Sequence, residues 1–126
     1  MEFIHNDRAP KAVGPYSQAT LTGNLIFCAG QIPLNPETMK IEVSTIEEQT
    51  RQVLHNISAV LSTKGLSLAN IVKTTVFLKN FADFPKMNGV YTEVFQGHNP
   101  ARSTVEVSRL PMDALVEIEC IAELTS

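Results

Sequence analysis

The sequence has no tryptophan, only two cysteines among 126 residues, and few charged residues of either sign. Cys28 and Cys120 each lie in an apolar stretch, which indicates reduced thiols in a core rather than a disulfide framework. Charged residues make up 18% of the chain and the net charge is -3, which disfavours duplex nucleic acid and anionic membranes as partners. No apolar run approaches the roughly 18 residues of a membrane-spanning helix. The N-terminal segment has no apolar signal region, so we expect a cytoplasmic protein.

The short motifs that usually mark catalysis or nucleotide binding are also missing. The sequence contains no CxxC, HExxH, GxSxG or GxGxxG motif and no phosphate-binding lysine loop. Its three histidines, His5, His55 and His98, fall in three different segments and do not form a metal-ligand cluster. We therefore predict no bound metal and no cofactor.

Length and composition indicate a single domain over residues 1–126. Hydrophobic residues make up 44% of the chain, which is typical of globular proteins, and no repeat or linker interrupts it. Residues 16–22 and 25–29 are short β-like runs separated by Gly23 and Asn24, which favours a hairpin.

Two helices and a strand are predicted in the middle of the chain. Ser44 and Glu47 have the spacing of a capping box, and the apolar residues that follow have helical spacing, so a helix is expected over 45–63. Residues 71–79 are rich in β-branched residues and predict a strand. A second helix follows, with Pro85 in its first turn.

Residues 102–110 and 115–124 alternate in polarity around residues 111–113, which predicts a terminal hairpin. The resulting order is ββ-α-β-α-ββ. It indicates an α+β fold in which two helices pack on one face of a mixed β-sheet.

The other face of this sheet also carries apolar side chains that must be shielded from water. In the strand over 71–79, Val72, Val76 and Leu78 point to one side, while Ile71 and Phe77 point to the other. Because the chain has nothing left to cover the second side, we expect a homo-oligomer packed through the sheet.

Charged residues on the predicted terminal hairpin mark the candidate site. Alternation places Arg102 and Thr104 on the same face as Glu117, the face assigned to subunit contacts. Arg102 and Glu117 are then either salt-bridge residues of the interface or part of a cleft for an anionic small molecule. The second interpretation has a chemical basis, because a guanidinium binds a carboxylate through two parallel hydrogen bonds.

Five segments, in order, resemble the RidA (YjgF-like) family of reactive-intermediate deaminases. They are GPYSQA (14–19), AGQIP (29–33), VKTTVF (72–77), PARSTVEV with RLP (100–111), and VEIE (116–119). The resemblance covers essentially the whole chain. It implies a chorismate-mutase-like fold, a homotrimer, and three sites in the clefts between subunits.

The resemblance also implies an activity, that of a 2-iminobutanoate/2-iminopropanoate deaminase, a cofactor-independent hydrolase. Such an enzyme converts 2-aminoacrylate and 2-aminocrotonate, products of pyridoxal-phosphate dehydratases, to 2-keto acids and ammonia. By the same resemblance, Arg102 clamps the substrate carboxylate and Glu117 orients the attacking water. Tyr16, Gly30 and Asn88 complete the pocket.

Two positions depart from the common family pattern. Thr104 stands where many members have a cysteine, and Ala29 stands where a hydroxyl residue often precedes the glycine. Without a thiol at position 104, direct hydration of the imine is expected, with Thr104 binding substrate through its backbone and its hydroxyl.

Two alternative functions stay open at this point. The same cleft could bind a 2-keto acid or an amino acid and report it to an interaction partner. Endoribonuclease or translation-inhibitor activity is also associated with resemblances of this kind. The acidic net charge and the aromatic content of only 6% count against nucleic-acid binding.

Overall fold

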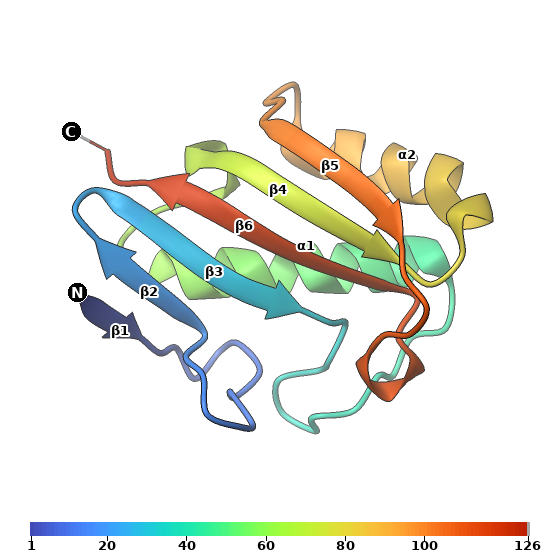
Figure 1. Ribbon diagram of the computed structural model, residues 1–126, viewed down its shortest axis with the longest axis horizontal. Coiled ribbons are helices and arrows are strands. Elements are labelled where there is room, and N and C mark those ends of the chain that lie inside the picture. Colours follow the sequence, from blue (N-terminus) through green and yellow to red (C-terminus); the bar gives the residue numbers. More distant parts are fainter. Residues whose placement is uncertain (126) are drawn as a thin grey trace.

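A computed structural model describes residues 1–125 and shows a six-stranded sheet with two helices against one face (Figure 1). The spatial order of the strands is β1-β2-β3-β6-β4-β5. The predicted α+β class with a mixed sheet is confirmed. The main elements are β1 (Glu2–Ile4), β2 (Ala19–Thr22), β3 (Leu25–Gln31), α1 (Ile46–Ser62), β4 (Ile71–Leu78), α2 (Phe84–Phe95), β5 (Ala101–Glu106) and β6 (Val116–Glu123).

The first helix begins one residue later than the predicted capping box implies. Thr45, not Ser44, is the N-cap, and its side-chain oxygen accepts a hydrogen bond from the backbone N–H of Glu48. The cap oxygen satisfies an N–H group that has no partner within the helix. Pro85 lies in the first turn of α2, as predicted, where its missing N–H costs nothing.

The hairpin of β2 and β3 turns at Gly23, whose φ of 58° is in the left-handed region that glycine adopts without strain. β1, which the sequence analysis did not predict, pairs antiparallel with β2. Three residues are too few to show an alternating pattern in the sequence.

The predicted terminal hairpin is wrong. β5 pairs parallel to β4 through the α2 crossover, and β6 lies between β3 and β4, antiparallel to both. The sequence shows two runs of alternating polarity joined by a short loop, but it does not show with which strands they pair. Here β6 is buried on its helix-facing side at the centre of the sheet, while β5 forms an edge.

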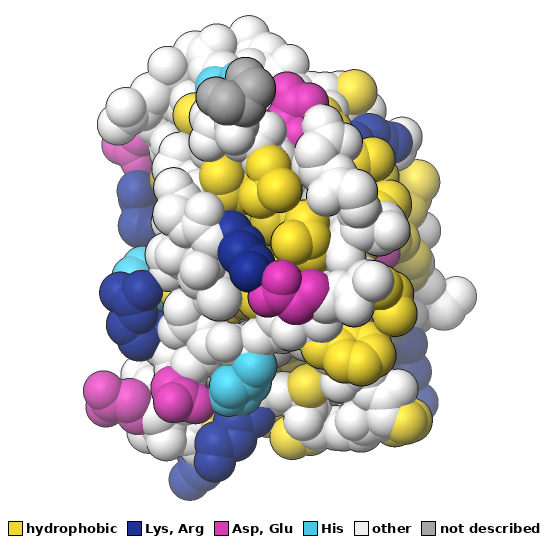
Figure 2. Space-filling model, turned by 90° about the vertical axis from the view of Figure 1, so that its left-hand side faces the viewer, with side chains coloured by type: hydrophobic (Ala, Val, Ile, Leu, Met, Phe, Trp, Pro, Cys, Tyr) yellow, Lys and Arg dark blue, Asp and Glu magenta, His cyan; other side chains and the backbone are white. Residues whose placement is uncertain are grey.

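The open face of the sheet carries large apolar side chains in contact with solvent. Phe3 is 69% exposed, and Phe27 and Val105 are each 42% exposed. Seen from one end of the molecule, hydrophobic side chains gather toward the right of the view, while charged side chains concentrate at the lower left (Figure 2). Unlike the prediction, Ile71 is buried in the core and Val72 is exposed, because the register of β4 against β6 shifts between residues 71 and 73.

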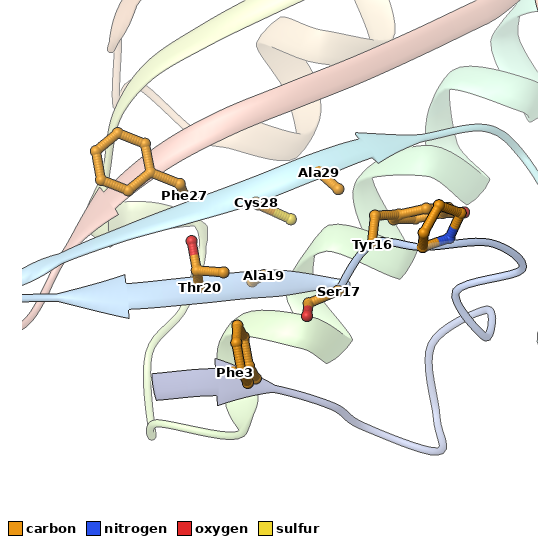
Figure 3. Close-up of a pocket in the computed structure, with 9 residues that line it drawn as sticks. Phe3, Tyr16, Ser17, Ala19, Thr20, Phe27, Cys28 and Ala29 are labelled. Carbon is orange, nitrogen blue, oxygen red and sulfur yellow. The ribbon is translucent and has the colours of Figure 1, made fainter. Parts of the chain in front are cut away.

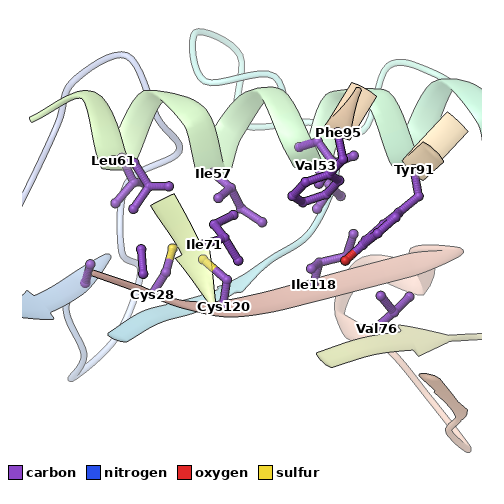
Figure 4. Packing of buried hydrophobic residues seen from close by; sticks show 14 of the residues in the cluster. Cys28, Val53, Ile57, Leu61, Ile71, Val76, Tyr91, Phe95, Ile118 and Cys120 are labelled. Atoms are coloured by element: carbon purple, nitrogen blue, oxygen red, sulfur yellow. The ribbon is translucent and has the colours of Figure 1, made fainter. Parts of the chain in front are cut away.

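The two cysteines lie opposite each other on β3 and β6, beneath α1 (Figure 4). Both are free thiols and both are buried, as predicted. The hydrogen bond with Cys28, together with burial, raises the pKa of the Cys120 thiol far above its ordinary value. The protonated pair therefore packs as small apolar side chains.

Within residues 1–125, no helix is both long enough and apolar enough to cross a bilayer.

Candidate functional site

Three of the predicted site residues, Tyr16, Gly30 and Glu117, line a single pocket of about 180 Å³. The end of β3 supplies Gly30 and the start of β6 supplies Glu117, strands that pair nearby at Gln31 and Ile118. Tyr16 comes from the segment that leads into β2 and is half exposed, at 52%. The structure thus brings together residues that are a hundred positions apart in the sequence.

Gly30 and Glu117 are in direct contact, and the contact requires glycine. A Cβ atom at position 30 would lie 2.7 Å from Oε2 of Glu117 and 2.9 Å from its Cδ. These distances are shorter than any ordinary van der Waals contact. The carboxylate of Glu117 therefore packs directly against the backbone of Gly30, and a ligand in the pocket can approach the carboxylate and this backbone closely.

Glu117 is half-buried, and burial raises the pKa of its carboxyl group above the ordinary value of 4.5. The negative charge of Glu119, on the same face of β6, raises the pKa further. A carboxylate with a raised pKa is a better proton acceptor near neutral pH than an ordinary exposed one.

Arg102 and Asn88 form a second group, at the junction of β5 and α2. Nη1 of Arg102 donates a hydrogen bond of 2.8 Å to Oδ1 of Asn88. The guanidinium carbon lies 4.8 Å from the ring centroid of Tyr91 and 5.5 Å from that of Phe84. These contacts fix the plane of the guanidinium beside a pocket of about 370 Å³ that Asn88, Tyr91 and Arg102 line.

Tyr91 is a site residue that the sequence analysis did not identify. Its hydroxyl shares a 2.7 Å hydrogen bond with Thr74, and burial raises the pKa of that hydroxyl. The sequence does contain a signal that could have identified Tyr91. It lies three residues after Asn88, and this spacing places both side chains on one face of the helix.

The predicted shared face of Arg102, Thr104 and Glu117 is wrong. Arg102 is in register with Thr74, which is fully buried beneath α2, so Arg102 points to the helix side. Glu117 lies on the open side, in register with Phe77. β5 is an edge strand, and its Val105 faces outward on the open side while Arg102 faces the helices.

Thr104 lies on the helix side with Arg102. Its hydroxyl oxygen is buried, and within the described part of the chain it has no hydrogen-bond partner. Buried hydroxyl groups usually have partners, so this oxygen is an exception. Thr104 does not line the pocket beside Arg102.

A shallow groove of about 600 Å³ runs across β1, β2 and β3 on the open face (Figure 3). Phe3, Thr20 and Phe27 line it, and Tyr16 lines both this groove and the pocket at Glu117. Residues 1–125 contain no group of three or more His, Cys, Asp or Glu side chains placed to hold a metal ion.

Comparison with known proteins gives the family. The family model described as Endoribonuclease L-PSP matches residues 6–124. The chain belongs to this family. It is the family that also carries the names YjgF, RutC and RidA, so the resemblance noted in the sequence is confirmed.

Relatives of the L-PSP family align over almost the entire chain. A RutC family protein of Pyrococcus horikoshii is 55% identical over 121 residues, which cover 96% of each chain. Reactive Intermediate Deaminase A of Arabidopsis thaliana, a chloroplastic protein, is 45% identical over 98% of this chain and 66% of its own. The crystal structure of E. coli TdcF with bound serine has a TM-score of 0.94 and 41% identity, and covers 99% of this chain and all of that one.

Proposed function

We propose that the chain is a cofactor-independent deaminase that hydrolyses 2-aminoacrylate and 2-aminocrotonate, through their imine tautomers, to 2-keto acids and ammonia. Two relatives support this proposal. One is named Reactive Intermediate Deaminase A, and another binds serine, which has the same carboxylate and nitrogen arrangement as these substrates.

The observation that carries the proposal is the contact between Glu117 and Gly30. A half-buried carboxylate with a raised pKa borders a small pocket, and the missing side chain of Gly30 leaves the space that this carboxylate occupies. In this position Glu117 holds a water molecule and accepts its proton as the water attacks.

Arg102 binds the substrate carboxylate. Its guanidinium uses one N–H group for Asn88 and keeps others for a carboxylate, which a planar fork holds with two parallel hydrogen bonds. The rings of Tyr91 and Phe84 hold the guanidinium of Arg102 in place before the substrate binds. This reduces the entropy that is lost when the reacting atoms are positioned.

The reaction needs no nucleophile other than water. The water oxygen bonds to the imine carbon, the π electron pair moves to nitrogen, and Glu117 takes a proton from the water. Transfer of that proton to nitrogen gives an aminoalcohol, which releases ammonia as the C–N bond breaks and the carbonyl forms. Because the imine is already electrophilic, positioning supplies most of the rate enhancement.

A complete site requires more than one copy of the chain. Arg102 and Glu117 lie on opposite faces of the sheet, and a substrate of three or four carbons cannot reach both through the sheet. We therefore infer a homotrimer in which the partner subunit's Arg102 meets Glu117 across the open face. The exposed Phe3 and Phe27 support this, because a contiguous apolar surface of this kind is typical of a protein contact.

The test couples the purified protein to a serine or threonine dehydratase and follows keto-acid formation, with semicarbazide competing for the free imine. Faster keto-acid release with less semicarbazone is expected. Binding of 2-keto acids without turnover would contradict deamination and favour a ligand sensor. RNA binding that weakens steeply with added salt, again without imine turnover, would favour the endoribonuclease function.

A further inference from the structure

Arg102, the proposed carboxylate clamp, is held mainly by aromatic rings. Among the described side chains its one hydrogen-bond partner is Asn88, and no carboxylate lies within ion-pair distance of it. The rings of Tyr91 and Phe84 have their centroids 4.8 and 5.5 Å from its guanidinium carbon. Because an aromatic ring attracts a cation over its face, the direction in which the guanidinium points depends on how these rings are held.

The ring of Tyr91 is held by a hydrogen bond to the sheet. Tyr91 extends from α2 toward the sheet with its hydroxyl group foremost (Figure 4), and this group shares a 2.7 Å hydrogen bond with the hydroxyl group of Thr74. Thr74 lies on β4, in register with Arg102 on β5. The hydrogen bond therefore links α2 to the sheet directly beside the strand position of the clamp.

Thr74 does not touch a ligand itself. It is 0% exposed and does not line the pocket beside Arg102, whereas Tyr91 does. The other three buried residues of β4 are all apolar: Ile71, Val76 and Leu78. Valine, which is also branched at Cβ and has nearly the same shape as threonine, would fill the same space in the core. Packing alone therefore does not require a hydroxyl group at this position.

The hydroxyl group of Tyr91 acts as a hydrogen-bond partner and not as a base. Burial raises the pKa of this group, although the hydrogen bond with Thr74 and the positive charge of Arg102 oppose the shift. The phenol is therefore neutral at physiological pH. The terminal torsion of a tyrosine side chain has a broad energy minimum, so a hydrogen bond at the far end of the ring restricts how far the ring can tilt.

We propose that Thr74 is a positioning residue of the site. Its hydroxyl group, acting through Tyr91, sets the plane in which Arg102 presents its N–H groups, and it thereby favours ligands with a carboxylate over neutral ligands of the same shape. This inference rests on the proposed role of Arg102 as the carboxylate clamp. Paired hydrogen bonds to a carboxylate are directional, so a guanidinium that tilts freely binds a carboxylate less tightly although its charge is unchanged.

The experiment measures two affinities by calorimetry, for 2-oxobutanoate, the keto acid formed from 2-aminocrotonate, and for its neutral amide. Thr74→Val combined with Tyr91→Phe removes both hydroxyl groups and leaves neither without its partner, so urea unfolding should be nearly unchanged. This double variant should bind 2-oxobutanoate about tenfold more weakly than wild type, with a similar loss in kcat/KM for imine hydrolysis, because the reacting groups are less well positioned. Its affinity for the amide should equal that of wild type.

Two further variants identify the cause. Thr74→Ser keeps the hydroxyl group and should retain most of the preference for the acid. Thr50→Val is the matched control, because Thr50 is equally buried and its hydroxyl oxygen has no hydrogen-bond partner in the described part of the chain; it should change neither affinity. If the double variant fails to fold by circular dichroism, Tyr91→Phe alone removes the same hydrogen bond, keeps the ring, and should lower the preference for the acid in the same direction.

The outcomes separate this inference from the proposed function. A double variant that binds both ligands as wild type does would refute the positioning role, and so would an equal loss on both ligands, which indicates a damaged pocket. A loss of the preference in Thr74→Ser would also refute it. None of these outcomes contradicts deamination. A wild-type protein without a preference for the acid would refute the clamp and the positioning role together. If wild type prefers the acid and the double variant does not, but no imine is hydrolysed, the positioning role is supported and deamination is refuted.

Discussion

Replacing Gly30 by alanine should separate activity from stability, because the three atoms nearest to the new methyl group all belong to the side chain of Glu117. The Cβ atom would lie 2.7 Å from Oε2, 2.9 Å from Cδ and 3.1 Å from Cγ of Glu117, where ordinary contacts are 3.4–4 Å. The carboxylate must therefore move by about 0.7 Å or more.

The cost in stability is expected to be small. Glu117 is long and flexible, and turning its side chain away from a preferred rotamer costs about 0.5–1.5 kcal/mol. Alanine recovers about 0.4–1 kcal/mol, because it restricts the unfolded chain more than glycine does. Since the φ of Gly30 is outside the left-handed region, the two effects nearly cancel, and the free energy of unfolding should change by less than about 1 kcal/mol.

The cost in activity is expected to be large. A displacement of about 1 Å in a positioned catalytic group lowers the rate by about 100-fold. We therefore expect kcat for imine hydrolysis to fall by about 30- to 100-fold in Gly30→Ala, as measured in the coupled semicarbazide assay, while urea unfolding is nearly unchanged.

Two controls identify the cause. Gly89→Ala adds the same methyl group in α2, where nothing lies within 4 Å; it should stabilise the helix by up to about 1 kcal/mol and leave kcat/KM unchanged. In a Glu117→Gln background, Gly30→Ala should lower the rate little further, since the two changes act on one group. A folded Gly30→Ala protein with kcat/KM within threefold of wild type would refute the reasoning.

The remaining predictions concern four variants: two in the site, one on the open face of the sheet and one at the buried cysteines. Arg102→Lys keeps the charge but loses the planar fork, so kcat/KM should fall by more than tenfold; a change within threefold would reject the carboxylate clamp. The kcat/KM of the wild-type protein should fall as pH drops through the raised pKa of Glu117, and Glu117→Gln should be slow and nearly independent of pH in that range. A carboxyl group whose pKa is raised in the folded protein lowers the free energy of unfolding at pH values above that pKa. Glu117→Gln should therefore be more stable than wild type at pH 7 and lose this advantage in acid, as thermal unfolding would show. Phe27→Glu places a charge on the open face and should dissociate the proposed trimer and abolish turnover; an active trimer by light scattering would exclude this face as the contact. Replacing Cys28 and Cys120 together by alanine should cost about 1 kcal/mol each and preserve the activity of the folded protein, whereas a folded, inactive trimer would overturn a mechanism without thiols.

The local pattern of the sequence determined the identity of most elements. The apolar spacing of α1, the turn at Gly23 and the β-branched run of β4 are signals within a few residues of one another, and the structure has all three. The ordered segments of the family resemblance also named Tyr16 and Glu117, which the structure brings into one pocket.

Tertiary structure alone decided how the last two strands pair and where their side chains point. An alternating strand can present either set of its side chains to the core, and pairing with the neighbour decides which. For β5 the parallel pairing with β4 turned Arg102 toward α2, where Asn88 and Tyr91 accept a cation that a purely apolar core would exclude. The separation of Arg102 from Glu117 follows from that pairing, because contacts between strands depend on the whole sheet and leave no local trace in the sequence.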